Sequence, residues 1–161
     1  MEKFGLPLPL DTPTRVAVAR HPVHPMLVTF PIAFFLGALA CDGAFLWSGD
    51  TFWARAALWL LGAGLVMGAL AGLAGTIELL AVEGIRRRAA SWSHFVAAVL
   101  LLAVQAVNWR ERMAVGVDEA VVPFGIMLSL LGAGWVAVAG WLGGKLVFEH
   151  QVGVGGDDTE D

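Results

Sequence analysis

Long apolar runs dominate the pattern of hydrophobic and polar positions in this chain, and four of them are near or above the length needed to cross a membrane. A transmembrane helix needs about 20 apolar residues to span roughly 30 Å of hydrocarbon. The strands of a membrane β-barrel would instead alternate polar and apolar residues over segments of about 10 residues. The pattern predicts helices over residues 25–47, 52–80, 93–108 and 122–147. The expected fold class is therefore all-α, an integral membrane four-helix bundle.

Composition and charge agree with this fold and orient it. Of the 161 residues, 58% are hydrophobic and 15% are charged, whereas about a quarter of the residues in a soluble domain carry charge. Seven of the ten basic residues, including Arg86 to Arg88, lie on the face that holds both termini. Because Lys and Arg are enriched in cytoplasmic loops, we expect both termini in the cytoplasm.

Residues 24–150 form the predicted transmembrane domain, and a polar segment flanks it on each side. Residues 1–23 are expected to be a cytoplasmic segment, since they lack the compact apolar stretch of a secretory signal. Residues 151–161 are acidic and are expected to be a disordered tail. The single cysteine, Cys41, permits no disulfide within the chain.

An internal repeat relates two of the four histidines, all of which lie at helix ends predicted on the cytoplasmic face. The string LLGAG occurs at residues 60–64 and again at 130–134, and the shift that carries Leu60 onto Leu130 also carries His24 onto His94. The related helices run in the same direction, so the chain predicts two parallel helical-hairpin repeats around an axis along the membrane normal. The alternative is a chance match between abundant residue types.

Helical phase adds support for a pair of facing imidazoles. Steps of three or four residues from His94 reach Gln105 and Asn108. Equal steps from His24 reach Asp42. Since polar side chains in lipid turn toward the bundle interior, we expect His24 and His94 to face each other.

Small residues form stripes on the second and fourth predicted helices. Such stripes allow close helix packing, and they also leave room for a flat ligand. The stripes are Gly64, Gly68, Ala71, Gly75 and Glu78 on the second helix, and Gly132, Val136, Ala139 or Gly140, and Gly143 on the fourth.

Two neutral imidazoles at one depth in a four-helix bundle predict a b-type haem, with one ring nitrogen on each face of the iron. The basic residues near this end would bind the haem propionates by charge-assisted hydrogen bonds, although they are explained equally well as determinants of topology. The sequence thus favours a membrane electron-transfer protein. The expected site residues are His24 and His94 as axial ligands, His150 or His21 as a supporting ligand, Gly68 and Gly75 beside the porphyrin, and Arg20 at the propionates.

Two other interpretations stay open. His24, His94 and Glu78, with His150 nearby, could hold a Zn, Fe, Mn or Cu ion, because imidazole and carboxylate ligate several of these metals. No HxxxH, ExxH or CxxC spacing sharpens this metal site, so it ranks below haem. Alternatively, the protein is a cofactor-free subunit whose glycine faces mediate assembly, including a homo-oligomer. Motifs for nucleotide or nucleic-acid binding are absent from the sequence.

Asp42, in the first predicted helix, is an intramembrane carboxylate and hence a candidate functional group. The arginines expected near its end of the bundle are Arg110 and Arg55, and either is a candidate partner. We favour a structural hydrogen bond for Asp42 over a proton relay.

Three motifs carry a resemblance to a known family: HPVHPMLVTFPIAF at 21–34, SWSHF at 91–95 and GWLGGKLVFEHQVGV at 140–154. The chain resembles a bacterial family of small four-helix membrane proteins classed as a domain of unknown function, which implies that it lies in the inner (plasma) membrane of a bacterium. The resemblance implies that the four motif histidines are the positions to consider, and an association with Rieske-type iron–sulfur proteins implies a redox role. Glu78 stands where the resemblance leads us to expect an aspartate.

Overall fold

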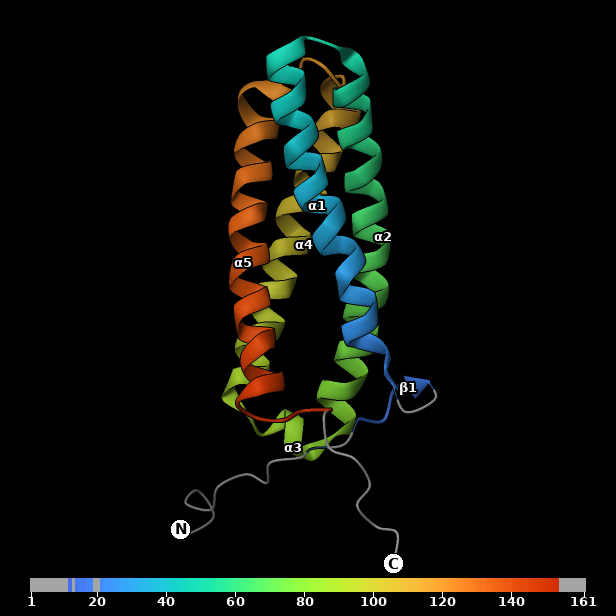
Figure 1. Ribbon diagram of the computed structural model, residues 1–161, viewed down its shortest axis with the longest axis vertical. Helices are drawn as coiled ribbons and strands as arrows, with labels where there is room; N and C mark the ends of the chain where they lie inside the picture. Colours follow the sequence, from blue (N-terminus) through green and yellow to red (C-terminus); the bar gives the residue numbers. More distant parts are fainter. Residues whose placement is uncertain (1–11, 13, 19–20, 154–161) are drawn as a thin grey trace, which may run out of the picture.

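The structure is a computed structural model that describes Thr12, residues 14–18 and residues 21–153. Four long helices lie side by side in an elongated bundle (Figure 1). All four are long and apolar enough to cross a membrane, which confirms the predicted all-α membrane bundle. They are α1 (Val23–Ser48), α2 (Thr51–Ala81), α4 (Ala89–Val115), and the continuous pair η1 (Val121–Gly125) and α5 (Ile126–Phe148).

A two-residue link reverses the chain between α1 and α2. Gly49 ends α1 with a φ of 69°, a left-handed conformation that glycine adopts without steric cost. Asp50 then begins α2, since its side chain accepts a hydrogen bond of 2.9 Å from the backbone N–H of Phe52. The two helices are therefore antiparallel neighbours, and we call them the first hairpin.

The third transmembrane helix, α4, is longer than the predicted residues 93–108. Arg112 was expected in a polar loop, but its side chain is buried and pairs with the carboxylate of Asp42. The helix therefore continues beyond this charged residue to Val115. The expectation was wrong because residue type alone does not reveal that a charge is neutralised inside the bundle.

The helices α4 and α5 form the second hairpin, and the two hairpins pack in parallel. Contacts are most extensive within each hairpin, while α2 also touches α4 and α1 also touches α5. The helices α1 and α4 thus occupy opposite corners of the bundle, as do α2 and α5. This arrangement is that of two parallel repeats around the bundle axis.

Four buried positions of α1 correspond to buried positions of α4 under the same shift that carries His24 onto His94. These positions face the bundle axis from opposite corners, so the repeat is visible in the packing itself. The corresponding pairs are Pro31 and Leu101, Phe35 and Gln105, Ala38 and Asn108, and Asp42 and Arg112.

The predicted alignment of the two LLGAG strings was wrong by two positions, because Gly64 of α2 corresponds to Gly132 of α5 and not to Gly134. Gly64 lies against the ring of Phe35, whereas Gly132 lies against the amide of Gln105. The second hairpin turns through an irregular link between Val115 and η1. A helix rises only about 1.5 Å per residue, whereas irregular backbone extends farther per residue. The second hairpin therefore needs fewer residues than the first between corresponding positions of its two helices.

Short elements close the end of the bundle at which the described chain begins and ends. The strands β1 (Ala17–Val18) and β2 (His21–Pro22) pair antiparallel, with Ala17 opposite Pro22. Thr12 forms a bridge to Val152, and α3 (Glu83–Arg86) connects α2 to α4 at the same end. Arg20 and most of the predicted disordered tail lie outside the described residues.

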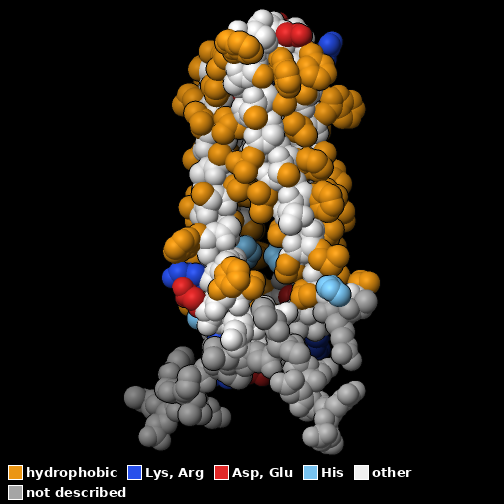
Figure 2. Space-filling view, in the orientation of Figure 1, with side chains coloured by type: hydrophobic (Ala, Val, Ile, Leu, Met, Phe, Trp, Pro, Cys, Tyr) orange, Lys and Arg blue, Asp and Glu red, His pale blue; other side chains and the backbone are white. Residues whose placement is uncertain are grey.

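The outer surface of the helices is apolar, as expected of a bundle surrounded by lipid. Figure 2 shows hydrophobic side chains along the length of the visible face, with charged groups confined to the two ends. Several tryptophans are among the most exposed side chains, including Trp47, Trp59 and Trp141.

Candidate functional site

His24 and His94 meet inside the bundle. His24 lies in the first turn of α1 and His94 near the beginning of α4. Their ring centroids are 5.9 Å apart, and the ring planes make an angle of 82°. The expected convergence of the two imidazoles across the bundle is therefore observed.

Each imidazole is anchored through Nδ1 to a backbone carbonyl of the partner helix in its own hairpin. The Nδ1 atom of His24 lies 2.8 Å from the carbonyl oxygen of Ala71, and that of His94 lies 3.0 Å from that of Ala139. Because a carbonyl oxygen only accepts hydrogen bonds, Nδ1 carries the hydrogen in both rings. In the neutral imidazole this leaves a lone pair on Nε2, as in most histidines that ligate metals.

A glycine provides the space for each imidazole. A Cβ atom added to Gly75 would lie 2.9 Å from Nδ1 of His24, and one added to Gly143 would lie 3.1 Å from Cε1 of His94. Each glycine follows the anchoring carbonyl residue by four positions, which places both on the same helix face. The glycines therefore fix where the rings can lie. Gly68, in contrast, lies against Leu102.

The two histidines line a cavity of about 400 Å³ between the hairpins. This volume lies within the roughly 300–1,000 Å³ of typical cofactor and ligand sites. Figure 2 shows a recess between the helices in which histidine side chains are visible. Most of the wall is apolar, and its polar residues are Thr14, His24, Thr76, Glu78, Ser91 and His94.

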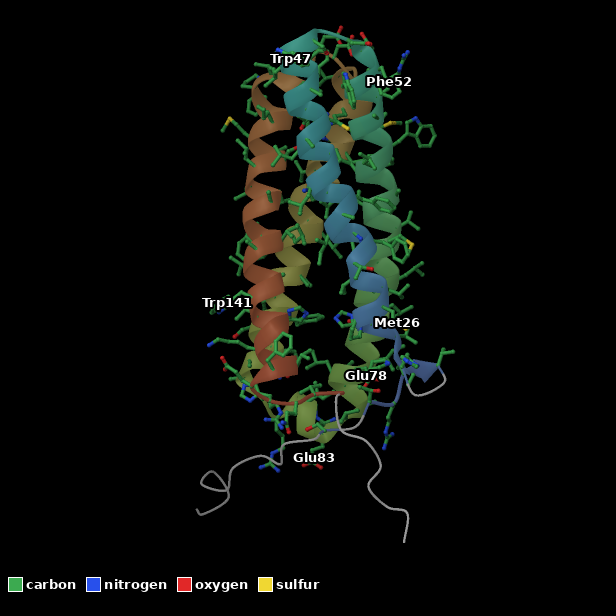
Figure 3. All side chains as sticks on the ribbon, in the orientation of Figure 1. Met26, Trp47, Phe52, Glu78, Glu83 and Trp141 are labelled. Carbon is green, nitrogen blue, oxygen red and sulfur yellow. The ribbon has the colours of Figure 1, made fainter. Side chains whose placement is uncertain are left out.

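The segment before α1 covers the end of this cavity nearest the described termini, where Figure 3 labels Glu78. The backbone N–H of Val16 donates a short hydrogen bond to Oε1 of Glu78. The guanidinium of Arg88 donates to the hydroxyl of Thr12 at 3.2 Å, and the N–H of Gly153 donates to the Thr12 carbonyl at 2.9 Å. These contacts hold the two ends of the described chain together below the histidines.

The remaining predicted site residues divide into three groups. Gly68, Gly75 and Glu78 line the same cavity as the two histidines. His21 is exposed on β2 and His150 follows α5, and neither lines the cavity. Arg20 lies outside the described residues.

The three predicted metal ligands do not gather around one point. Within the described part of the chain, no three His, Cys, Asp or Glu side chains lie close enough together to hold a metal ion. Glu78 therefore does not complete a three-ligand site with His24 and His94.

At the opposite end of the bundle, Asp42 and Arg112 form a fully buried ion pair. The Nη1 atom of Arg112 lies 2.8 Å from Oδ1 of Asp42, and Nη2 lies 2.7 Å from Oδ2. The expectation that Arg110 or Arg55 is the partner was wrong: the side chain of Arg110 is exposed and pairs with Glu111. The repeat that relates the two histidines also carries Asp42 onto Arg112, and this signal could have identified the partner.

Polar neighbours satisfy this ion pair. The hydroxyl of Ser129 donates to Oδ2 of Asp42 at 2.6 Å and accepts a hydrogen bond from Nδ2 of Asn108 at 2.9 Å. The Oδ1 atom of Asn108 accepts from Nε of Arg112 at 3.0 Å. The network joins α1, α4 and α5, so its role is to hold the hairpins together, in agreement with the structural role expected for Asp42.

Comparison with known proteins identifies one family. Residues 20–156 match a family described as predicted membrane protein DUF2231. No curated protein and no solved structure shows a significant match to the chain.

Proposed function

The chain belongs to this family of predicted membrane proteins, and on that premise we propose that it transfers electrons within the membrane through a b-type haem held by His24 and His94. A haem supplies a one-electron redox centre whose potential depends on its axial ligands and surroundings. The observation that carries the proposal is the pair of imidazoles facing each other across an apolar cavity, each with Nδ1 already bonded.

The spacing of the rings suits two ligands of one metal centre. Metal–nitrogen bonds to histidine are about 2 Å long, so two imidazoles that held one metal ion between them would have centroids roughly 6 Å apart. The observed separation of the His24 and His94 centroids is 5.9 Å. The ring separation is therefore compatible with two imidazoles that would hold one iron.

The surrounding residues of this chain have three tasks. The carbonyls of Ala71 and Ala139 fix the tautomer and orientation of the imidazoles and raise their basicity as ligands. Gly75 and Gly143 provide the space that the two imidazoles occupy. The apolar wall limits access of water to the site, which affects the redox potential.

We also propose on which side of the membrane the haem site lies and which kind of protein exchanges electrons with it. The excess of basic residues at the end with Arg86 to Arg88 supports a cytoplasmic site in a bacterial inner membrane. A Rieske-type protein is the proposed redox partner, on the basis of the resemblance stated for the sequence motifs.

An optical spectrum of the protein purified in detergent tests the function. We expect a red protein whose Soret band is lost in His24→Ala and in His94→Ala. The matched controls are His21→Ala and His150→Ala, because neither residue lines the cavity. Both controls should retain the band.

Two results would overturn the haem assignment. A colourless protein with one equivalent of a transition metal, lost in the His24→Ala variant, would instead support a metal site at the same histidines. A colourless protein without metal would leave assembly through the helix faces as the function.

A further inference from the structure

Two polar atoms on the cavity wall have no hydrogen-bond partner among the described residues. They are Oε2 of Glu78 and Oγ of Ser91. Both side chains line the cavity, and the residues are only 7% and 3% exposed. Because an unpaired polar group in an apolar interior costs free energy, these atoms indicate a polar group on the cavity's ligand.

The two residues lie at the same level, beyond the histidines and toward the described termini. Glu78 follows Gly75 on α2 by three residues, and Ser91 precedes His94 on α4 by three residues. Three residues of helix rise about 4.5 Å, so both side chains lie about one turn from the imidazole level. Figure 3 shows Glu78 at this end of the bundle.

The hydrogen-bonding capacity of the pair defines the chemistry of its partner. Oε1 of Glu78 already accepts the N–H of Val16, which leaves Oε2 as an acceptor. The hydroxyl of Ser91 can donate. A protonated carboxylic acid, with one O–H donor and one carbonyl acceptor, complements such a pair.

We propose that Glu78 and Ser91 bind a propionic acid side chain of the porphyrin, with one proton shared between that group and Glu78. This inference rests on the proposed function. Two carboxyl groups that approach each other in an apolar site do not both ionise, and they share a proton instead. The shared proton provides the hydrogen bond that Oε2 of Glu78 lacks. The carbonyl oxygen of the propionic acid group accepts a hydrogen bond from the hydroxyl of Ser91.

Titration of the cofactor-free protein with haem b and with haem dimethyl ester tests the inference, with the Soret band as the readout. The ester has no acidic proton to share, so the wild-type protein should bind haem b roughly tenfold or more tightly than the ester. In Glu78→Leu the two affinities should become similar, and in Ser91→Ala the preference should decrease.

The control variants separate this role from the folding of the covering segment. Glu83→Gln changes an exposed glutamate of α3 and should leave the preference unchanged. Val16→Pro removes the other hydrogen bond of Glu78 while Oε2 and Ser91 remain, so the preference should persist.

The possible failures are distinguishable. Equal affinity of the wild-type protein for haem b and its ester, or a preference that survives in both Glu78→Leu and Ser91→Ala, would overturn the inference and leave the proposed function intact. Absence of a Soret band with either porphyrin would overturn both.

Discussion

Asp42 and Arg112 occupy equivalent positions in the two hairpins and form a bidentate ion pair, with nitrogen–oxygen distances of 2.8 and 2.7 Å. A residue on the axis between the two hairpins contacts the equivalent residue of the other hairpin, so two charges of the same sign at such positions would repel each other. At one end of the bundle the equivalent residues Asp42 and Arg112 carry opposite charges and attract each other. At the other end the equivalent residues are both histidine, which is compatible with sharing one ligand because neutral imidazoles do not repel.

Removal of one partner of the ion pair is expected to destabilise the bundle strongly. Replacement of Arg112 by Met leaves the Asp42 carboxylate buried without its partner, and breaking a buried pair in this way typically costs about 3–5 kcal/mol. Thermal unfolding in detergent should show a large decrease in the midpoint for Arg112→Met. The matched control is Arg87→Met, since the Arg87–Glu83 pair is exposed and 3.6 Å long.

A charge exchange tests whether the two positions are equivalent. The double variant Asp42→Arg with Arg112→Asp places the same pair on the axis in the opposite order. It should recover part of the stability that each single variant loses. A double variant that is less stable than both single variants would show that the surrounding residues Ser129 and Asn108 recognise only the native order.

The glycines beside the imidazoles give a second prediction. In Gly75→Ala the new Cβ would lie 2.9 Å from Nδ1 of His24, so the ring must move away from the Ala71 carbonyl. We expect a loss of about 1–3 kcal/mol in stability, typical of an overpacked interior, together with weaker binding of the proposed haem.

Gly134→Ala is the control for the glycine prediction. A Cβ atom at Gly134 meets nothing within 4 Å, and alanine is a better helix former than glycine. Its thermal midpoint and Soret titration should match or exceed those of the wild-type protein. Equal behaviour of Gly75→Ala and Gly134→Ala would contradict the role of Gly75.

The sequence allowed prediction of the features that follow from periodicity and repetition. The four spans, the parallel hairpins and the facing of His24 and His94 required only hydrophobic runs and helical phase. The alignment of α2 with α5 failed because LLGAG consists of the most abundant residue types, whereas the side chain that each glycine contacts defines the true register. The partner of Asp42 was missed because Arg112 was assigned to a loop by its charge.

Gln105 provides a third prediction. It is buried beside the hydrogen-bond network of Asp42 and Arg112, but its own amide is not fully hydrogen-bonded. Its Nε2 atom has no partner among the described residues, and Oε1 receives only a long contact of 3.4 Å from Asn108. Removal of an unsatisfied buried amide is favourable, so Gln105→Met should leave stability unchanged or raise it by about 1 kcal/mol.

Asn108→Leu is the informative comparison for Gln105→Met. Asn108 accepts from Nε of Arg112 and donates to Ser129. Its replacement therefore leaves Nε of Arg112 without this acceptor, while Ser129 keeps its hydrogen bond to Asp42. Unfolding in detergent should show a loss of about 1–3 kcal/mol for Asn108→Leu. If Gln105→Met were equally destabilised, Gln105 would have a role that its contacts do not explain.

The segment that covers the cavity gives a fourth prediction. Val16→Pro removes the N–H that binds Glu78, whereas Val16→Ala retains it. Hydrogen exchange measured by mass spectrometry should become faster across residues 14–18 in Val16→Pro, with little change in Val16→Ala. Identical exchange in both variants would show that the Glu78 bond does not hold this segment.

The burial of Arg112 also sharpens the prediction of membrane orientation. Charges that are paired inside the bundle do not act as loop charges, so the exposed basic residues at the Asp42 end are Arg55 and Arg110. Arg15, Arg86 and Arg87 are exposed at the opposite end, which supports the expected cytoplasmic location of that end. In a Cys41→Ala background, a membrane-impermeant maleimide added to intact cells should label Ser48→Cys and should label Arg87→Cys only after the cells are opened. The reverse pattern would place the histidine cavity near the outer face and would require a redox partner on that side.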